Sequence, residues 1–166
     1  IPCEEGQVCE EGQCVQAFGD LDCIGVSKCV AGCQEEEQCQ EDCYYEGTEQ
    51  GQTDFDAFLV CTDTFCGQFF AQEKPAAGSS CTLENCKNEY VSCVEVGSAD
   101  CGETLQCMEG CNEDNACLGS CVTEADFDAL IELTDILVCF EENCPDPATW
   151  QQCATSQCLM QSMACL

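Results

Sequence analysis

A pattern of paired cysteines constrains this chain more than any other feature of its sequence. Two C-x3-C pairs stand five residues apart, Cys29 with Cys33 and Cys39 with Cys43. Residues four apart in a helix lie one turn above each other, so each pair directs two thiols to one side. The pattern predicts two short helices folded back on each other and joined by an outer bridge, Cys29–Cys43, and an inner bridge, Cys33–Cys39.

The cysteine content is typical of a disulfide scaffold. The 166 residues include 23 cysteines, well above the roughly 8–10% that marks such scaffolds in secreted proteins. Zinc sites commonly use C-x2-C pairs with histidine, and this chain has neither. We therefore expect an oxidising compartment, extracellular or at the cell surface. The start, Ile1-Pro2-Cys3, lacks methionine, as in a processed product.

The cysteines repeat along the chain. Seven recur 78 positions later and three more recur 72 positions later, with one gap between the two groups. Flanking residues repeat as well, since Leu59-Val60-Cys61 matches Leu137-Val138-Cys139. The sequence predicts a duplication with three segments: a short cysteine-rich N-terminal segment (1–21), module 1 (22–99) and module 2 (100–166).

Each module is predicted to be helical, because Glu, Gln and Ala are frequent and strand-like alternation is absent. Beyond the hairpin, we expect a third helix over Thr53–Phe65, capped by Thr53, and a fourth over Thr82–Val94. Their counterparts would be roughly Thr123–Phe140, expected to be the longer of its pair, and Ala154–Leu166. The expected fold class is all-α: a disulfide-rich tandem repeat of small modules, each with a stapled α-hairpin and two further helices.

The same spacing argument predicts the other bridges. Cys61 and Cys66 are five apart, as are Cys81 and Cys86, so two antiparallel helices would join Cys66 to Cys81 and Cys61 to Cys86. The remaining pairs would be Cys23–Cys93, Cys107–Cys121, Cys111–Cys117, Cys144–Cys153, Cys139–Cys158 and Cys101–Cys165. Connectivity cannot be deduced from sequence alone, so this nested scheme is a prediction for peptide mapping to test.

Three cysteines remain in the N-terminal segment. Cys3, Cys9 and Cys14 cannot all pair with one another, so one would bond upstream residues, another subunit, or nothing. Glu-Glu-Gly-Gln occurs twice in this segment, and its glycines are typical of tight turns.

Several apolar residues are candidates for contact surfaces. Phe69 and Phe70 open the loop expected over Gly67–Ser80, where they either form a contact patch or fill the small core. The same two interpretations apply to Tyr44-Tyr45 and to Trp150.

The C-terminal stretch is apolar and carries Met160 and Met163. Methionines commonly fill cores, which is the default expectation here. Burial against a neighbouring subunit is the alternative.

The formal net charge of −30 limits the partners. Lys28, Lys74 and Lys87 are the only basic side chains. Nucleic acids and anionic membranes would repel such a protein, and no apolar run approaches the roughly 20 residues that span a bilayer. Acidic side chains suit Ca²⁺, but no calcium-loop motif locates a site. We expect no nucleic-acid partner, no membrane insertion and no cofactor.

Catalytic equipment is sparse. The chain has no histidine for general base chemistry, no arginine for anion stabilisation and no glycine-rich phosphate loop. Carboxylate pairs mark glycosidases, but among 33 acids they carry no signal. We expect no enzyme activity and name no catalytic residue.

The cysteine pattern of 22–166 runs C-x5-C-x3-C-x5-C-x3-C, then Leu-Val-Cys-x4-Cys and Cys-x4-Cys-x6-Cys. It resembles cysteine-rich secreted proteins and lipoproteins of unassigned function from myxobacteria-like bacteria. The twin C-x3-C hairpin is similar to the α-hairpinins of plants, which implies the nested pairing. Those peptides act through basic or specific loop residues, so no functional residue carries over to these acidic loops.

Two functions fit these observations best. One is a secreted or cell-surface structural protein that assembles with itself into a fibre or surface layer, because head-to-tail contacts that do not close make filaments. The other is a ligand- or protein-binding module of a larger extracellular protein, of the adhesin or inhibitor type. Sequestration of cations is a third.

Overall fold

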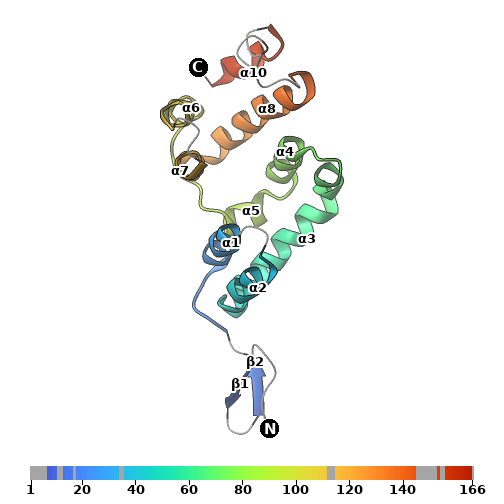
Figure 1. Cartoon of the computed structure of the whole chain (residues 1–166), viewed down its shortest axis with the longest axis vertical. Helices are drawn as coiled ribbons and strands as arrows, with labels where there is room; N and C mark the ends of the chain where they lie inside the picture. Colours follow the sequence, from blue (N-terminus) through green and yellow to red (C-terminus); the bar gives the residue numbers. More distant parts are fainter. Residues whose placement is uncertain are drawn as a thin grey trace. The chain divides into compact units, whose positions relative to one another are not determined.

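The computed structural model of the chain is mostly helical (Figure 1). It divides into two compact units. Unit 1 comprises Ile1–Val60 with Asn88–Val94, and unit 2 comprises Cys61–Lys87 with Glu95–Leu166. The structure describes residues 7–10, 13–16, 18–33, 36–111, 115–144, 153 and 156–165. Of these, 7–10, 13–16, 115, 116, 162 and 164 are described by their backbone alone.

The fold is all-α and disulfide-rich, as the sequence predicts. The described helices are α1 (Cys23–Gly32), α2 (Glu37–Tyr45), α3 (Glu49–Ala71), α4 (Pro75–Asn85), α5 (Lys87–Cys93), α6 (Cys101–Gly110), α7 (Asn115–Glu124), α8 (Phe127–Asn143) and α10 (Leu159–Ala164). A small antiparallel hairpin precedes them, formed by β1 (Gln7–Glu10) and β2 (Gln13–Gln16), with Cys9 opposite Cys14. The sequence predicts only tight turns there.

Aspartate side chains begin three of the helices. Asp22 and Asp126 each accept a hydrogen bond from the backbone N–H three residues on, at 2.8 and 2.7 Å. Asp100 does the same for Glu103 at 2.8 Å, and the Glu103 carboxylate accepts the Asp100 N–H in return at 3.2 Å. These bonds satisfy N–H groups that lack a partner inside the helix, which explains where α1, α6 and α8 start.

Ten disulfides join the described cysteines, and they are the same ten pairs as in the nested scheme. The pairs are Cys23–Cys93, Cys29–Cys43, Cys33–Cys39, Cys61–Cys86, Cys66–Cys81, Cys101–Cys165, Cys107–Cys121, Cys111–Cys117, Cys139–Cys158 and Cys144–Cys153. Each of these bridges joins two cysteines within 22–99 or two within 100–166, so no disulfide among the described cysteines connects the two predicted modules. The compact units do not coincide with the predicted modules, because residues 61–87 and 95–99 of the predicted module 1 belong to unit 2.

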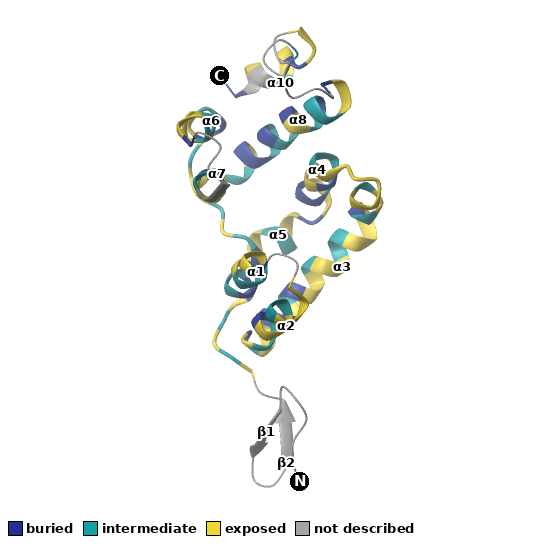
Figure 2. Cartoon of the chain, viewed as in Figure 1, coloured by how far each residue is buried: buried dark blue, intermediate teal, exposed yellow. Residues whose placement is uncertain are grey.

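Sulfur makes up much of the buried core. In unit 1, Cys23 and Cys93 pack with Val26 and Phe55. In unit 2, α8 buries its apolar face (Figure 2), and the cystines at its C-terminal end form a second cluster from Cys139, Cys144 and Cys158. Small domains have marginal cores, and one bridge closing a loop of about 15 residues contributes about 3 kcal/mol in the chain-entropy treatment. The bridges therefore supply stability that these cores lack.

The segment before each stapled hairpin pairs with the residues that follow it. Gly19 and Leu21 donate backbone N–H groups to the carbonyls of residues 46–47 at 3.1 and 3.0 Å. The same two bonds occur 78 positions later, at 2.8 Å each, between residues 97–99 and 124–125. A Cβ on the glycine that opens either segment would collide with the opposite backbone, so both positions require glycine.

The third helix is longer than predicted. Thr48, and not Thr53, begins it, because the Thr48 hydroxyl accepts the Gly51 N–H at 3.0 Å. Thr53 lies within the first turns and donates its hydroxyl to the Glu49 carbonyl at 2.8 Å. The helix then continues to Ala71, so the loop predicted over Gly67–Ser80 is wrong, and α3, not α8, is the longer of the pair.

The end of α3 explains that error. The N–H of Glu73 donates to the Phe70 carbonyl at 3.1 Å and the N–H of Lys74 donates to the Phe69 carbonyl at 3.0 Å, which is the Schellman pattern of helix termination. Glu73 takes the left-handed conformation, φ 57°, that glycine usually occupies there. Without that glycine the helix end leaves no clear mark in the sequence.

The predicted fourth helix is divided. Its residues lie in α4, which starts earlier than expected at Pro75, and in α5, with Cys86 between them. In module 2, α8 begins at Phe127 and continues to Asn143, later at both ends than predicted. Of the helix predicted over Ala154–Leu166, the structure describes α10 (Leu159–Ala164) and few residues around it.

Candidate interaction site between α4 and α8

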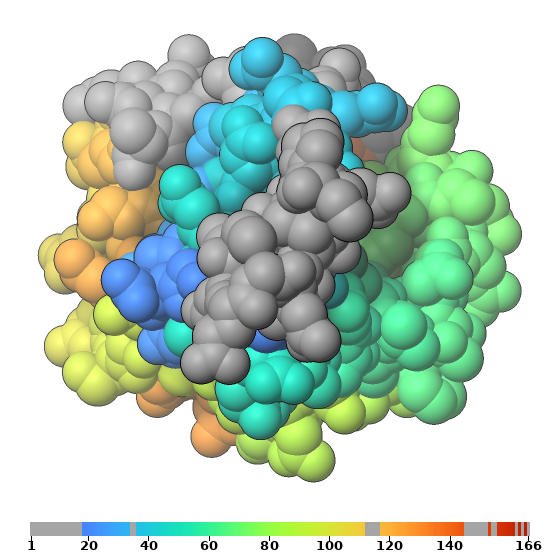
Figure 3. Space-filling model, turned by 90° about the horizontal axis from the view of Figure 1, so that it is seen from below, coloured from blue at the N-terminus to red at the C-terminus, as the bar shows by residue number. Residues whose placement is uncertain are grey.

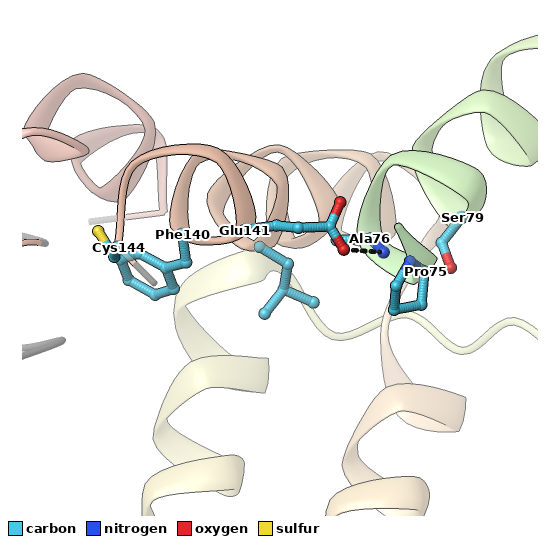
Figure 4. A pocket seen from close by; sticks show the side chains of 7 residues that line it. Pro75, Ala76, Ser79, Phe140, Glu141 and Cys144 are labelled. Atoms are coloured by element: carbon cyan, nitrogen blue, oxygen red, sulfur yellow. Dashed lines mark hydrogen bonds between the residues drawn. The ribbon is translucent and has the colours of Figure 1, made fainter. Parts of the chain in front are cut away.

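Helix α4 takes its N-terminal cap from a different helix. Lys74 precedes α4 and its side chain does not cap it, and Pro75 in the first turn has no N–H to satisfy. The Glu141 carboxylate, from α8, accepts the N–H of Ala76 through one oxygen (Figure 4) and that of Ala77 through the other, both at 3.2 Å. A carboxylate there also meets the positive end of the helix dipole. One side chain of the predicted module 2 thus completes a helix of the predicted module 1, and both lie in unit 2.

A shallow hollow of about 520 Å³ lies beside this cap. Its lining is mainly apolar, and the side chains come from both helices within unit 2: Pro75, Ala76, Ser79, Leu137, Phe140, Glu141 and Cys144. Leu137 is 46% exposed. The hollow can accommodate an apolar side chain of a partner. The Glu141 carboxylate is already hydrogen-bonded to two backbone N–H groups.

A second contact links the start of α5 to the start of α8. The Lys87 ammonium lies 4.3 Å from the centre of the Phe127 ring. Such cation–π contacts contribute about 0.5–1 kcal/mol at exposed sites. Lys87 thus joins Glu141 in holding together parts of the two modules inside unit 2.

Phe69 and Phe70 lie in the last turn of α3 and not in a loop. Phe70 is 44% exposed, and its ring covers Gly78 of α4 so closely that a Cβ there would lie 2.6 Å from it. Phe69 is partly buried. The pair therefore neither fills a core nor stands free, since one ring covers the neighbouring helix.

The tyrosines after the first hairpin pack at the edge of the unit 1 core. The Tyr44 hydroxyl donates to the Asp56 carboxylate at 2.9 Å, and the Tyr44 ring lies near Phe55. Burial and this hydrogen bond raise the pKa of Tyr44 above its ordinary value. Burial also raises the pKa of Tyr90, whose ring contacts Phe58 edge to face.

The methionines of α10 contradict the core expectation. Met160 is 78% exposed and Met163 is 59% exposed, and Leu159 beside them is 49% exposed. The six-residue helix therefore presents apolar side chains to solvent, which is the arrangement that the subunit-contact alternative requires.

Among the residues that the structure describes, three groups of side chains have ligand atoms close enough for a metal ion. They are Cys33, Cys39 and Cys43; Cys107, Cys111 and Cys121; and Cys101, Glu132 and Cys165. Every cysteine among them is in a disulfide, which leaves no thiolate to bind a metal. Sulfurs of neighbouring bridges also lie close together, with Cys33 and Cys43 at 3.5 Å. The first two groups are therefore parts of neighbouring disulfides, and the third is one disulfide beside Glu132. They give no location for the calcium site that the acidic composition suggested.

Some predicted site residues lie outside the described part of the chain. Cys3 and Trp150 are among them, and the side chains of Cys9 and Cys14 are not described. Among the described helices, none is long and apolar enough to cross a membrane.

Comparisons with known proteins place no family name on this site. No family model, no curated protein and no solved structure matches the chain. The resemblance to bacterial cysteine-rich proteins and to plant hairpins therefore stays a prediction.

The sequence gives no sign of Glu141, because one acid among 33 does not stand out. The signal that could have found the cap lies at the start of α4, where the sequence offers no capping side chain. Pro75 marks a helix start, yet Lys74 before it cannot cap that start, so an acceptor from elsewhere in the chain is one way to satisfy its N–H groups.

Proposed function

We propose that this protein is an extracellular structural protein, built of two copies of one module, that associates with itself through exposed apolar side chains. The ten disulfides fit an oxidising compartment. The proposal is that this compartment is the extracellular space. No residue is proposed to catalyse a reaction.

The exposure of α10 carries this proposal. Exposed apolar side chains that gather on one element commonly mark contact sites, and methionine is frequent on such surfaces because it adapts its shape. Met160 and Met163 are more than half exposed in a segment that is covalently tied to the fold through Cys158 and Cys165.

Charge sets the condition for this association. Two copies with a formal charge of −30 repel each other, and the repulsion weakens as salt shortens the screening length to about 8 Å at physiological ionic strength. Association should therefore strengthen with added salt and with divalent cations.

Light scattering on the purified oxidised protein tests the proposal. We expect its average mass to rise with concentration at high salt, and the double variant Met160→Ser with Met163→Ser to show a smaller rise. Val122→Ser, at another exposed apolar position, is the matched control and should behave as the wild type. A mass that stays monomeric at every concentration and salt level would overturn the proposal.

A binding module is the second candidate, and the hollow between α4 and α8 favours it. An apolar hollow on a protein of this charge suits a cationic partner with an exposed apolar side chain, because opposite charge steers the encounter. Leu137→Asp should then reduce binding of a basic amphipathic peptide measured by calorimetry, while Val122→Asp, at an exposed apolar position outside the hollow, should not. Equal binding by both variants would remove the hollow as the site.

A further inference from the structure

Helix α3 repeats the residues with which α8 receives α4. Glu141 corresponds to Asp63, 78 positions earlier, and Leu137 corresponds to Leu59 in the Leu-Val-Cys that both helices share. Aspartate, like glutamate, accepts backbone N–H groups at helix starts. Asp63 can therefore perform on α3 the capping that Glu141 performs on α8.

This part of α3 is open. Leu59 is 48% exposed and Val60 is 65% exposed. Asp63 is exposed too, and its carboxylate accepts no hydrogen bond from the residues that the structure describes. Figure 3, where α3 runs from turquoise to green, shows atoms of this helix on the surface of the molecule. The α3 surface thus has the residues of a docking site, and these residues are exposed.

A sequence like that of the capped segment occurs in module 2. Helix α4 begins with Pro75-Ala76-Ala77, and Pro147-Ala148-Thr149 stands 72 positions later. The later segment lies outside the described residues, so this correspondence is one of sequence alone. Helix α4, near the end of module 1, packs on α8 of module 2. By the same relationship, the end of module 2 would pack on α3 of another copy.

We propose that the α3 surface formed by Leu59, Val60 and Asp63 docks the end of module 2 from a second copy of this chain, with Asp63 acting there as Glu141 acts on α4. The proposal rests on the proposed self-association and names its surface. The contact joins the α3 surface of one copy to the end of module 2 (the tail) of another. The first copy's tail and the second copy's α3 surface therefore stay unoccupied. Such a contact continues head to tail.

The contact between copies is weaker than the one inside the chain. The positions of Lys87 and Phe127 correspond to Leu159 and Glu49, which cannot repeat the cation–π contact. The two copies also repel each other and carry no connecting segment. Association is therefore reversible and salt-dependent.

Sedimentation velocity of the full oxidised chain at high salt tests the surface with Asp63→Ala. This change removes one negative charge, so general repulsion alone would strengthen association. The proposal predicts the opposite, an association about fivefold weaker, from the loss of a cap contributing about 1 kcal/mol. Glu142→Ala removes the same charge at an exposed position of α8 and should not weaken association. Asp63→Glu keeps the carboxylate and should retain it.

The outcomes separate the two proposals. If the wild type associates and Asp63→Ala associates equally well, the α3 surface is wrong while self-association stands. If the wild type remains monomeric, both proposals fall. Circular dichroism should show the same helical signal in each variant as in the wild type. This control excludes loss of folding as the cause of a weaker association.

Discussion

The Glu141 carboxylate accepts the Ala76 N–H at 3.2 Å and so caps one helix from another. This contact connects parts of the chain that no described disulfide joins. Glu141→Ala should therefore destabilise the α4–α8 contact by about 1 kcal/mol, the usual loss on removing a cap. Hydrogen exchange of the Ala76 and Ala77 amides should become faster, whereas Glu142→Ala should leave it unchanged. Unchanged exchange in Glu141→Ala would mean that the cap contributes nothing.

Glu73→Gly should stabilise the protein. Glu73 holds a left-handed conformation, φ 57°, which costs a residue with a Cβ about 1 kcal/mol. Glycine relieves that cost but loses more backbone entropy on folding, so we expect a net gain below about 1 kcal/mol. Denaturant unfolding measures it, with Glu84→Gly, at an exposed position inside α4, as the destabilising control. A loss of stability in Glu73→Gly would contradict the assignment of this helix end.

Alkaline pH should destabilise unit 1 through its tyrosines. The pKa of Tyr44 is raised by burial and by its hydrogen bond to Asp56, and the pKa of Tyr90 is raised by burial. The folded state therefore keeps phenol protons that the unfolded state releases above about pH 10. The stabilising effect is fully present below that pH and is lost as pH rises through the folded-state pKa values.

Unfolding free energies measured from neutral pH to above pH 10 check this expectation. Tyr44→Phe removes one of the two tyrosines with a raised pKa. The unfolding free energy of this variant should therefore fall less steeply with rising pH. A decline of equal steepness in Tyr44→Phe would exclude Tyr44 as a cause.

Much of this architecture follows from sequence because covalent geometry is strict. The C-x3-C spacing of Cys29 and Cys33 places two sulfurs on one side of a helix, which favours the nested pairing across a hairpin without knowledge of the core. Helix ends are harder, since Glu73 replaces the usual glycine and Thr48 and Thr53 offer the same side chain. The Met160 error has another origin: residue type predicts burial only when a core large enough to receive the side chain exists.

The contact between α4 and α8 was beyond sequence reasoning. It depends on a single carboxylate that reaches a helix start some 65 residues away in sequence. Nothing local to Glu141 distinguishes it from its neighbour Glu142. Only the missing cap at Lys74 points to such a partner, and it does not say which acid supplies it.

The surplus cysteine gives a covalent test of association. The 166 residues contain 23 cysteines, an odd number, so at least one cysteine thiol lacks a disulfide partner among them. A nonreducing gel of native-source protein should show multimers that collapse to one band on reduction if this thiol joins subunits. Replacing Cys3, Cys9 and Cys14 together by serine should remove those multimers. A single monomer band before reduction would mean that association is noncovalent.

The most direct test of head-to-tail association mixes two blocked variants. Asp63→Lys blocks the α3 surface, and Met160→Glu with Met163→Glu blocks the tail. Each variant alone should be monomeric in sedimentation velocity at high salt, because each lacks one half of the contact. Mixed in equal amounts, they should form a dimer that does not grow, since the intact tail of one meets the intact α3 surface of the other. A mixture that stays monomeric, or a single blocked variant that still forms long assemblies, would contradict the account.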